Sequence, residues 1–385
     1  MDYAKESLRV HKEQQGKIST GLNVPIETKD DLSIAYTPGV AEPCRVIAKD
    51  KNEAFTYTIK GNLVGVITDG SAVLGLGNIG PDASIPVMEG KAALFKRFAG
   101  VNSFPIAIDT QDVEEFIKTV KLIAPIFGGI NLEDISAPRC FEIEERLKAE
   151  LDIPVFHDDQ HGTAIVVLAG IINSLKLVKK EKEDLKIVIM GSGAAGVAIT
   201  KLLLLFGVKN IISVDREGAI YEGREKNMNS SKEGLAKITN LEKRKGKLED
   251  VIAGADIFVG VSAPNVLTKD MVRNMSDKPI IFALSNPDPE ITLKDAKEAG
   301  AYIVATGRSD YPNQINNVLV FPGIFKGALE VRAKNITEEM KLAAAHALAN
   351  SIVDVTPEKI IPGAFELNTA EIISNAVKKC HTDSC

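Results

Sequence analysis

The feature that most constrains the fold is a regular alternation of short apolar strands with helices between residues 186 and 305. A strand predicted at Lys186–Met190 leads into an apolar helix at Ala194–Phe206, and the next strand is expected at Asn210–Val214. Further strands are predicted at 256–261, 279–284 and 301–305. Strands that alternate with helices are typical of an α/β fold with a doubly wound, Rossmann-type parallel sheet.

The first half of the chain alternates in the same way, with longer irregular loops. Strands and helices are predicted in turn at 63–68, 87–98, 104–108 and 113–123. A chain of 385 residues is too long for one ordinary core. We therefore expect two domains, a smaller α/β domain over residues 1–160 and the Rossmann-type domain over residues 161–385, which includes a helical C-terminal tail.

Composition argues against several classes of function. The net charge is −6 and no basic stripe offsets it, so we expect no nucleic-acid partner. No apolar run reaches the ~18 to 20 residues that span a bilayer, and the nearest, Ala164–Leu177, is shorter. Four cysteines are too few for a disulfide framework, and the N-terminus lacks the apolar core of a signal peptide. We expect a cytoplasmic protein that acts on a small molecule and needs no membrane.

Two acidic pairs end apolar stretches of the first half. Asp158 and Asp159 lie between a strand predicted at 153–156 and a helix predicted at 164–178, and Glu133-Asp134 ends an earlier apolar run. Two carboxylates about 4 Å apart repel by roughly 4 kcal/mol at an effective dielectric constant of 20. Converging carboxylates therefore indicate a cation, and oxygen ligands suit Mg²⁺ or Mn²⁺. Helix capping by the same acids is the structural alternative.

The motif Gly-x-Gly-x-x-Gly occurs twice and has a different context each time. The second copy follows a strand and opens a helix, where free N–H groups can hold a pyrophosphate. Its residues are Gly191, Ser192, Gly193, Ala194, Ala195 and Gly196. The first copy (Gly75, Gly77, Gly80) precedes Pro81-Asp82 and is not expected to open a helix. We interpret it as a loop that borders the substrate, or as a packing turn.

Asp215 ends the strand that follows the second glycine motif. An acid at this position accepts hydrogen bonds from the adenosine ribose and disfavours a 2′-phosphate, so NAD is the expected cofactor. Arg216 beside it could instead attract that phosphate, so NADP stays open.

Lys91 is predicted in the middle of the apolar stripe of a helix, with Val87 and Met88 one turn before it and Leu94 and Phe95 one turn after it. Burial disfavours the charged amine and lowers its pKa, so Lys91 could act as a general base near neutral pH. The alternative is a lysine at the edge of the stripe whose amine reaches solvent.

Tyr36 precedes Thr37-Pro38, which we interpret as the N-cap and first residue of a helix. The positive end of that helix would favour the phenolate and ease proton exchange. A partly buried structural tyrosine is the alternative. Asn286 and Asn317 lie near the ends of strands in the second half, where ligands bind in open α/β sheets, although turn chemistry also explains Asn286-Pro287.

Taken together, these segments resemble the malic enzymes, and among them the short bacterial and archaeal type. The matching segments follow the expected order at 36–41, 68–77, 89–91, 131–134, 157–163, 191–196, 282–287, 316–317 and 321–323. The resemblance implies oxidative decarboxylation of malate to pyruvate and CO₂ with reduction of NAD(P)⁺, in a homodimer or larger homo-oligomer.

The resemblance also implies a role for each candidate side chain. It gives the metal ligands as Glu133, Asp134 and Asp159, the general base as Lys91, the general acid as Tyr36, the acid that orients the lysine as Asp158, and the substrate-binding amides as Asn286 and Asn317. One departure is Ser71-Ala72, where longer malic enzymes carry an arginine for the substrate carboxylate. Two alternatives stay open: an amino-acid dehydrogenase, which needs no metal, and a non-catalytic dinucleotide sensor.

Overall fold

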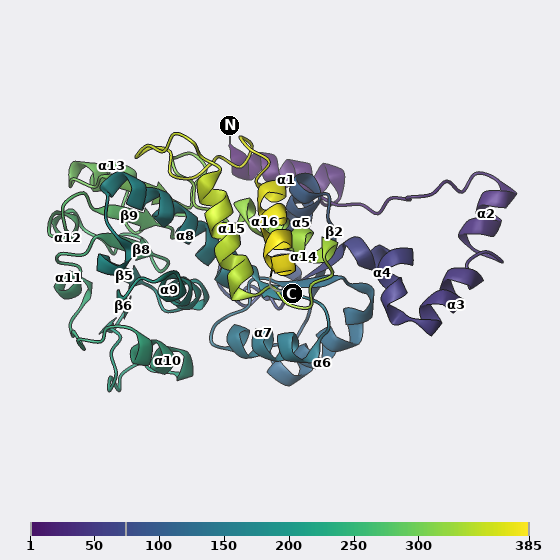
Figure 1. Ribbon diagram of the computed structural model, residues 1–385, viewed down its shortest axis with the longest axis horizontal. Helices are drawn as coiled ribbons and strands as arrows, with labels where there is room; N and C mark the ends of the chain where they lie inside the picture. The colour runs from purple at the N-terminus through teal and green to yellow at the C-terminus, as the bar shows by residue number, and fades with distance from the viewer. Residues whose placement is uncertain (1, 74, 384–385) are drawn as a thin grey trace.

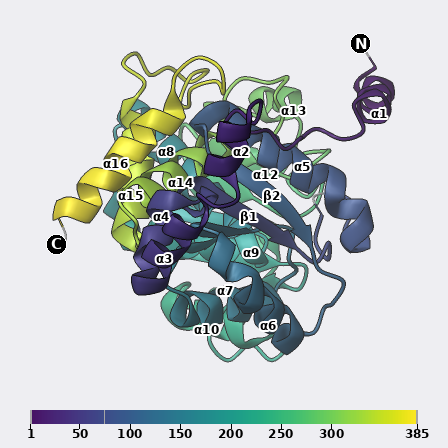
Figure 2. The same cartoon turned by 90° about the vertical axis from the view of Figure 1, so that its right-hand side faces the viewer.

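The computed structural model describes residues 2–73 and 75–383 and contains two sheets with helices around them (Figures 1 and 2). The first sheet is wholly parallel with the strand order β2-β1-β3-β4. Its strands are β1 (Leu63–Thr68), β2 (Asn102–Ala107), β3 (Gly129–Leu132) and β4 (Val155–His157). Its helices are α5 (Gly80–Ala99), α6 (Val113–Ile123) and α7 (Arg139–Glu150).

The second sheet has the order β10-β9-β8-β5-β6-β7, and all its pairs are parallel except β6 with β7. Its strands are β5 (Lys186–Met190), β6 (Asn210–Asp215), β7 (Gly218–Ala219), β8 (Ile257–Gly260), β9 (Ile280–Ala283) and β10 (Ile303–Thr306). The helices between them are α9 (Ala194–Phe206), α10 (Ser230–Ile238), α11 (Leu248–Val251), α12 (Lys269–Arg273) and α13 (Leu293–Glu298). The predicted two-sheet α/β fold with a Rossmann-type second half is confirmed.

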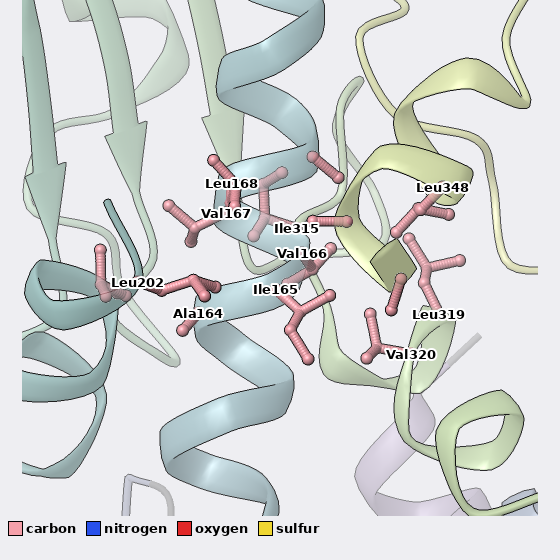
Figure 3. Packing of buried hydrophobic residues seen from close by; sticks show 14 of the residues in the cluster. Ala164, Ile165, Val166, Val167, Leu168, Leu202, Ile315, Leu319, Val320 and Leu348 are labelled. Atoms are coloured by element: carbon pink, nitrogen blue, oxygen red, sulfur yellow. The ribbon is translucent and has the colours of Figure 1, made fainter. Parts of the chain in front are cut away.

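Helix α8 (Asp158–Val178) joins the two sheets through a continuous apolar core. Figure 3 shows its side chains Ile165 to Leu168 between Leu202 of α9 and Leu348 of α15 (Glu338–Asn350). By length and composition α8 could cross a membrane, but 61% of its apolar window is buried in the protein. That burial is typical of the core helix of a globular protein. The expected domain boundary after residue 160 falls in its first turn.

The C-terminal helices pack on the first half of the chain. Helix α14 (Phe321–Glu330) meets α5 through edge-to-face ring contacts of Phe95 with Phe321 and Phe325, whose centroids lie 4.7 and 5.4 Å away. Helix α16 (Thr369–Asp383) packs against α14 and α15. These helices are part of the core cluster that includes α8, so the tail is structural.

The N-terminal residues form a projecting segment, visible on the right of Figure 1. Its helices are α2 (Lys29–Ala35), α3 (Ala41–Lys49) and α4 (Ala54–Tyr57), whereas α1 (Tyr3–Gln14) lies at the top of that view. Among residues 2–62 none is buried, so this part of the described chain has no core of its own.

Two helices begin earlier than the sequence predicted. Helix α5 opens at Gly80, the last glycine of the first motif, so the expectation that this motif opens no helix was wrong. Pro81 lies in its first turn, where a missing N–H costs no hydrogen bond. Helix α8 opens at Asp158, which places Asp158 and Asp159 in its first turn.

Candidate active site

The carboxyl ends of β3 and β4 bring three predicted acids together. Glu133 and Asp134 follow β3, and Asp159 lies in the first turn of α8, directly after β4. Each can offer one carboxylate oxygen within 4.8 Å of the others. The backbone N–H of Asp134 donates to Asp159 Oδ2 at 2.8 Å, and Asp134 has a left-handed φ of +54°. Such a φ costs a non-glycine residue roughly 1 kcal/mol or more, so this turn stores strain beside the acids.

Lys91 of α5 points into the same cluster. Its Nζ lies 2.6 Å from Asp158 Oδ2 and 2.8 Å from Glu133 Oε1, and it stands 4.2 Å above the ring of Phe321. Only 7% of the residue is exposed, so the prediction of a buried lysine is confirmed.

The predicted fall in the pKa of Lys91 was wrong for this state of the protein. Burial by itself lowers the pKa of Lys91, but the charges of Asp158, Glu133 and Asp159 together raise it above its usual value. The periodicity of α5 revealed the apolar surroundings and could not show acids that arrive from β3 and α8.

Burial and neighbouring charges also shift the pKa values of the acids. Burial raises the pKa of Asp158 to about 7, although Lys91 opposes the shift, and burial likewise raises the pKa of Asp159 to about 6. The pKa of Glu133 is raised as well, first by burial. The carboxyl groups of Glu133, Asp158 and Asp159 therefore share the ammonium of Lys91, and together they carry more negative charge than it balances.

The two predicted asparagines lie in different surroundings. Asn317 begins the short helix η5 (Asn317–Leu319), where a Cβ placed on Gly162 would lie 3.1 Å from Asn317 Cβ and 1.8 Å from Asp158 Oδ1. Glycine at 162 thus lets Asn317 and Asp158 approach each other. Asn286 follows β9, and its backbone oxygen lies 3.4 Å from the Cβ position of Gly75. The first glycine loop therefore borders the Asn286 turn at Gly75, and whether it borders the substrate stays a prediction.

Arg139, which was not predicted from the sequence, holds together the loops that follow β1 and β3. Arg139 donates to Asp69 Oδ2 at 2.8 Å and to Ser71 Oγ at 3.0 Å, and Ala72 N–H donates to the carbonyl of Asp134 at 2.9 Å. The loop after β1 is thereby tied to the loop after β3. Arg139 and Asp69 are 70 positions apart, so no local pattern could have revealed the pair.

His161 also serves to hold elements together. Its Nε2 lies 2.8 Å from Glu144 Oε1 of α7, and its Nδ1 lies 3.1 Å from Lys341 Nζ of α15. Burial lowers the pKa of His161 to about 4, so near pH 7 the ring is neutral, donates to Glu144 and accepts from Lys341. This network fixes the start of α8, and with it Asp159.

The second glycine motif lines a separate cleft of about 710 Å³ at the carboxyl ends of β5 and β6. Gly191 has a φ of +120°, and a Cβ there would lie 2.7 Å from the carbonyl oxygen of Val261. A Cβ on Gly196 would lie 1.9 Å from the carbonyl oxygen of Gly191. Ser192 and Gly193 line the cleft, and Ala194 and Ala195 open α9. The chain thus has the tight turn at a helix N-terminus that a pyrophosphate requires.

Asp215 ends β6 at this cleft, but its carboxylate is occupied. It accepts from Arg224 Nη2 at 2.6 Å, from Lys232 Nζ at 2.8 Å and from three further donors. Burial raises its pKa, but these hydrogen bonds prevail and hold the pKa of Asp215 at about 2. The prediction of NAD over NADP assumed an unpaired carboxylate, and the arrangement of Arg224 and Lys232 removes that basis.

Tyr36 is not brought to Lys91 within this chain. It is the C-cap of α2, a helix of the projecting segment, and it is 68% exposed. The prediction that Thr37 and Pro38 start a helix was wrong, because α3 begins only at Ala41 and has Val40 as its N-cap.

A Rossmann-type sheet with a tight glycine turn, next to a buried lysine among carboxylates, has the features of a dinucleotide-dependent enzyme. Two domain families match the chain: "Malic enzyme, N-terminal domain" over residues 15–148 and "Malic enzyme, NAD binding domain" over residues 160–380. The chain belongs to the malic enzyme family.

Individual relatives agree over nearly the whole length. A bifunctional malic/malolactic enzyme from Bacillus subtilis is 56% identical over 98% of this chain and 93% of its own. An NAD-dependent malic enzyme from Geobacillus stearothermophilus is 59% identical over 94% of this chain and 76% of its own. The crystal structure of an NAD-dependent malic enzyme from Thermotoga maritima superposes with a TM-score of 0.94 at 52% identity, covering 96% and 98% of the two chains.

Proposed function

We propose that this chain catalyses the oxidative decarboxylation of L-malate to pyruvate and CO₂, with reduction of NAD(P)⁺ and dependence on a divalent cation. The observation that carries the proposal is the buried Lys91 between Asp158 and Glu133, beside three converging carboxylates. Family membership supports the same reaction and leaves no need for the amino-acid dehydrogenase alternative.

The three acids fit a hard divalent cation. Glu133, Asp134 and Asp159 would hold Mg²⁺ or Mn²⁺, because each offers a carboxylate oxygen within 4.8 Å of the others. When bound, such an ion acts as a Lewis acid that draws electron density from the oxygen atoms of a hydroxy or keto acid.

Lys91 is the proposed general base. Its Nζ would take the proton of the C2 hydroxyl as hydride leaves C2 for the nicotinamide. Asp158, 2.6 Å away, positions the amine. Once the charges of Glu133 and Asp159 are balanced, the carboxylates raise the pKa of Lys91 less, and burial can bring that pKa down towards neutrality.

The remaining roles concern the substrate. Asn317 lies beside Asp158 and would hold a substrate oxygen without adding charge. Asn286, at the carboxyl end of β9, would contact the substrate or the nicotinamide ribose. After CO₂ departs, the phenol of Tyr36 would donate its proton to C3 of enolpyruvate, which gives pyruvate.

The charge around Asp215 favours NADP⁺. Arg216, Lys232 and Lys247 line the cleft together with only two acids, Asp215 and Glu249. Because Asp215 is already paired with Arg224 and Lys232, a 2′-phosphate would meet excess positive charge. We propose that NADP⁺ is used at least as well as NAD⁺, and a strong preference for NAD⁺ in kcat/KM would overturn this.

A coupled malate assay with each cofactor, with and without Mn²⁺, tests the function. We expect CO₂ and pyruvate only with Mn²⁺ present, and Lys91→Ala should abolish malate oxidation. A non-catalytic dinucleotide sensor would bind the cofactor and release no CO₂. Since Cys44 and Cys140 are free thiols, we also propose a cytoplasmic location, which fractionation of the source cells would check.

A further inference from the structure

Glu290 is a buried carboxylate of the second half of the chain that has no part in the mechanism above. It lies in the loop between β9 and α13, and none of it is exposed. Its Oε1 accepts from the backbone N–H of Ser262 at 2.9 Å, and its Oε2 accepts from the backbone N–H of Ser285 at 3.0 Å. Burial raises the pKa of Glu290, although these N–H groups oppose the shift. A buried carboxylate costs free energy, so its presence here requires a reason.

The two N–H groups belong to different loops at the carboxyl edge of the sheet. Ser262 follows β8 and lines the cofactor cleft, whereas Ser285 follows β9 directly before Asn286. The backbone strengthens the same link, because the N–H of Leu267 donates to the carbonyl of Glu290 at 3.0 Å. Glu290 therefore connects the wall of the cofactor cleft to the turn that presents Asn286.

The sequence leaves room for this carboxylate at Gly260, the last residue of β8. A Cβ on Gly260 would lie 2.4 Å from Glu290 Cδ and 2.7 Å from Glu290 Oε1, which is closer than non-bonded atoms come in proteins. Gly260 does not have a left-handed φ, so its backbone would accept another residue. The glycine is therefore required by the side chain of Glu290 and not by a turn.

The two linked loops lie on the side of the sheet where the nicotinamide is expected. A dinucleotide binds across the point at which the strand order reverses, which is between β5 and β8 in this sheet. Its adenosine half would lie over β5 and β6, where Gly191 and Asp215 line the cleft, so its nicotinamide half would lie over β8 and β9. The Asn286 turn also approaches Gly75 of the first half of the chain. The link made by Glu290 is thus placed where cofactor and substrate must meet.

We propose that Glu290 is a positioning residue for hydride transfer. Its carboxylate holds the loop after β8 and the Asn286 turn at a fixed spacing, so that the nicotinamide faces C2 of the substrate. Glu290 itself touches neither cofactor nor substrate. The inference rests on the proposed function for the reaction that is aligned, but the link between the two loops can be measured without that reaction.

Glu290→Gln tests the link with almost no change of shape. The amide keeps one acceptor oxygen and turns an NH₂ donor towards the other backbone N–H, so one loop loses its hydrogen bond. We expect kcat for malate oxidation to fall about 100-fold, because a shift of about 1 Å in the reacting groups suffices for such a loss. The Kd of NADP⁺, measured by calorimetry, should stay near that of the wild type, since the turn at Gly191 is unchanged. A variant that loses only cofactor affinity and keeps its kcat would overturn the proposal.

Decarboxylation of oxaloacetate separates positioning from a general loss of structure. With Mn²⁺ this reaction needs the acids of the first sheet and no hydride transfer. Glu290→Gln should therefore decarboxylate oxaloacetate at the rate of the wild type while it oxidises malate slowly. An equal loss of both reactions would contradict the role in alignment.

Asp256→Asn is the matched control, because Asp256 joins segments at the opposite edge of the same sheet. Its Oδ2 accepts from the backbone N–H of Lys186 at 2.8 Å, and its Oδ1 accepts from Ser276 Oγ at 2.6 Å, both at the amino ends of the strands. This variant should lower the unfolding temperature and keep kcat. If its kcat fell as far as that of Glu290→Gln, lost stability would explain both variants and the proposal would be wrong.

Gly260→Ala reaches the same link and keeps the charge of the carboxylate. Its Cβ would displace the side chain of Glu290, so we expect the same fall in kcat, with the Kd of NADP⁺ and the decarboxylation of oxaloacetate kept. This variant carries the test if Glu290→Gln yields no soluble protein. Malate turnover at the wild-type rate in Gly260→Ala would count against the proposal.

Amide hydrogen exchange tests the link apart from the reaction. The N–H groups of Ser262 and Ser285 should exchange faster in Glu290→Gln than in the wild type, because the hydrogen bonds that protect them are weakened. Unchanged exchange at both positions would show that Glu290 does not hold the loops. A wild type that does not oxidise malate would contradict the proposed function, and the exchange rates would still decide whether the link exists.

Discussion

Two buried charge clusters of this enzyme are unbalanced in opposite directions. In the first sheet, the carboxyl groups of Glu133, Asp158 and Asp159 lie around the ammonium of Lys91. In the second sheet, one carboxylate, Asp215, is held between the cations Arg224 and Lys232. Because uncompensated buried charge is costly, each imbalance indicates the sign of the missing ligand. The first cluster suits a divalent cation and the second an anionic phosphate.

Removing one acid from the first cluster should have the largest effect. Saturating Mn²⁺ should stabilise the wild type by about 2.7 kcal/mol at a concentration of 100 Kd, seen as a higher unfolding temperature. Asp159→Asn should lose most of that shift and lower kcat/KM for malate by about three orders of magnitude, because Lewis-acid assistance is worth several kcal/mol. Calorimetry and a coupled assay measure both quantities.

The control for this experiment is Asp152→Asn, which changes an exposed carboxylate of the same half. It should keep the stabilisation by Mn²⁺ and the turnover. An equal shift of the unfolding temperature in the wild type and in Asp159→Asn would show that the ion binds elsewhere.

Removing one cation from the second cluster should have a smaller and more selective effect. Lys232→Ala leaves the Asp215–Arg224 pair neutral, so the attraction for a 2′-phosphate should weaken. We expect the ratio of kcat/KM for NADP⁺ to that for NAD⁺ to fall about tenfold, the equivalent of about 1.4 kcal/mol. Lys226→Ala, an exposed lysine paired with Glu217, is the control. An unchanged ratio would separate Lys232 from the phosphate.

A third effect, comparable in size with the second, concerns stability in acid. The pKa of Asp215 in the folded protein, about 2, lies below the value of an unfolded aspartate. Its contribution to the free energy of unfolding is therefore present above about pH 4 and is lost as the pH falls towards 2, by roughly 1 to 2 kcal/mol. Urea titrations of wild type and Asp215→Asn should converge over this range. Parallel curves would contradict the ion pair.

The first cluster should respond to pH in the opposite sense in the absence of metal. Burial raises the pKa of Asp158 to about 7 and that of Asp159 to about 6. Because these values exceed those of unfolded aspartates, the stability that these groups contribute is present in acid and lost as the pH rises through 7. Measuring the free energy of unfolding over both pH ranges, with and without Mn²⁺, would therefore distinguish the two clusters.

Local patterns were enough to predict most of the fold and the positions of the acids. Alternating strands and helices located both sheets, and Glu133 and Asp159 were recognised because each ends a strand whose apolar run is visible in the sequence. The glycine turn at Gly191 was found for the same reason, since a strand, a turn and a helix follow one another within a few residues.

The properties of the site that the sequence did not reveal depend on contacts between residues far apart in the chain. The charge state of Lys91 depends on acids from two other elements, and the availability of Asp215 depends on Arg224 and Lys232. Arg139 braces a loop that precedes it by some 70 positions. Tyr36 was expected at a helix start, but it is the C-cap of α2 on the projecting N-terminal segment, and no local pattern shows where that segment lies.

The chain passes between its two sheets twice, through α8 and again through η5 into α14. Helix α14 packs on α5, and Asn317 begins the short helix that leads into α14. Asn317 is therefore attached to the first sheet, although it follows the last strand of the second. Any hinge motion that swings the cofactor sheet open would leave Asn317 beside Asp158 and carry Asn286 away. Binding of malate and its alignment with the nicotinamide would then be separable events. The contact of malate with Asn317 would persist in the open enzyme, and the alignment would be established only when the sheets close.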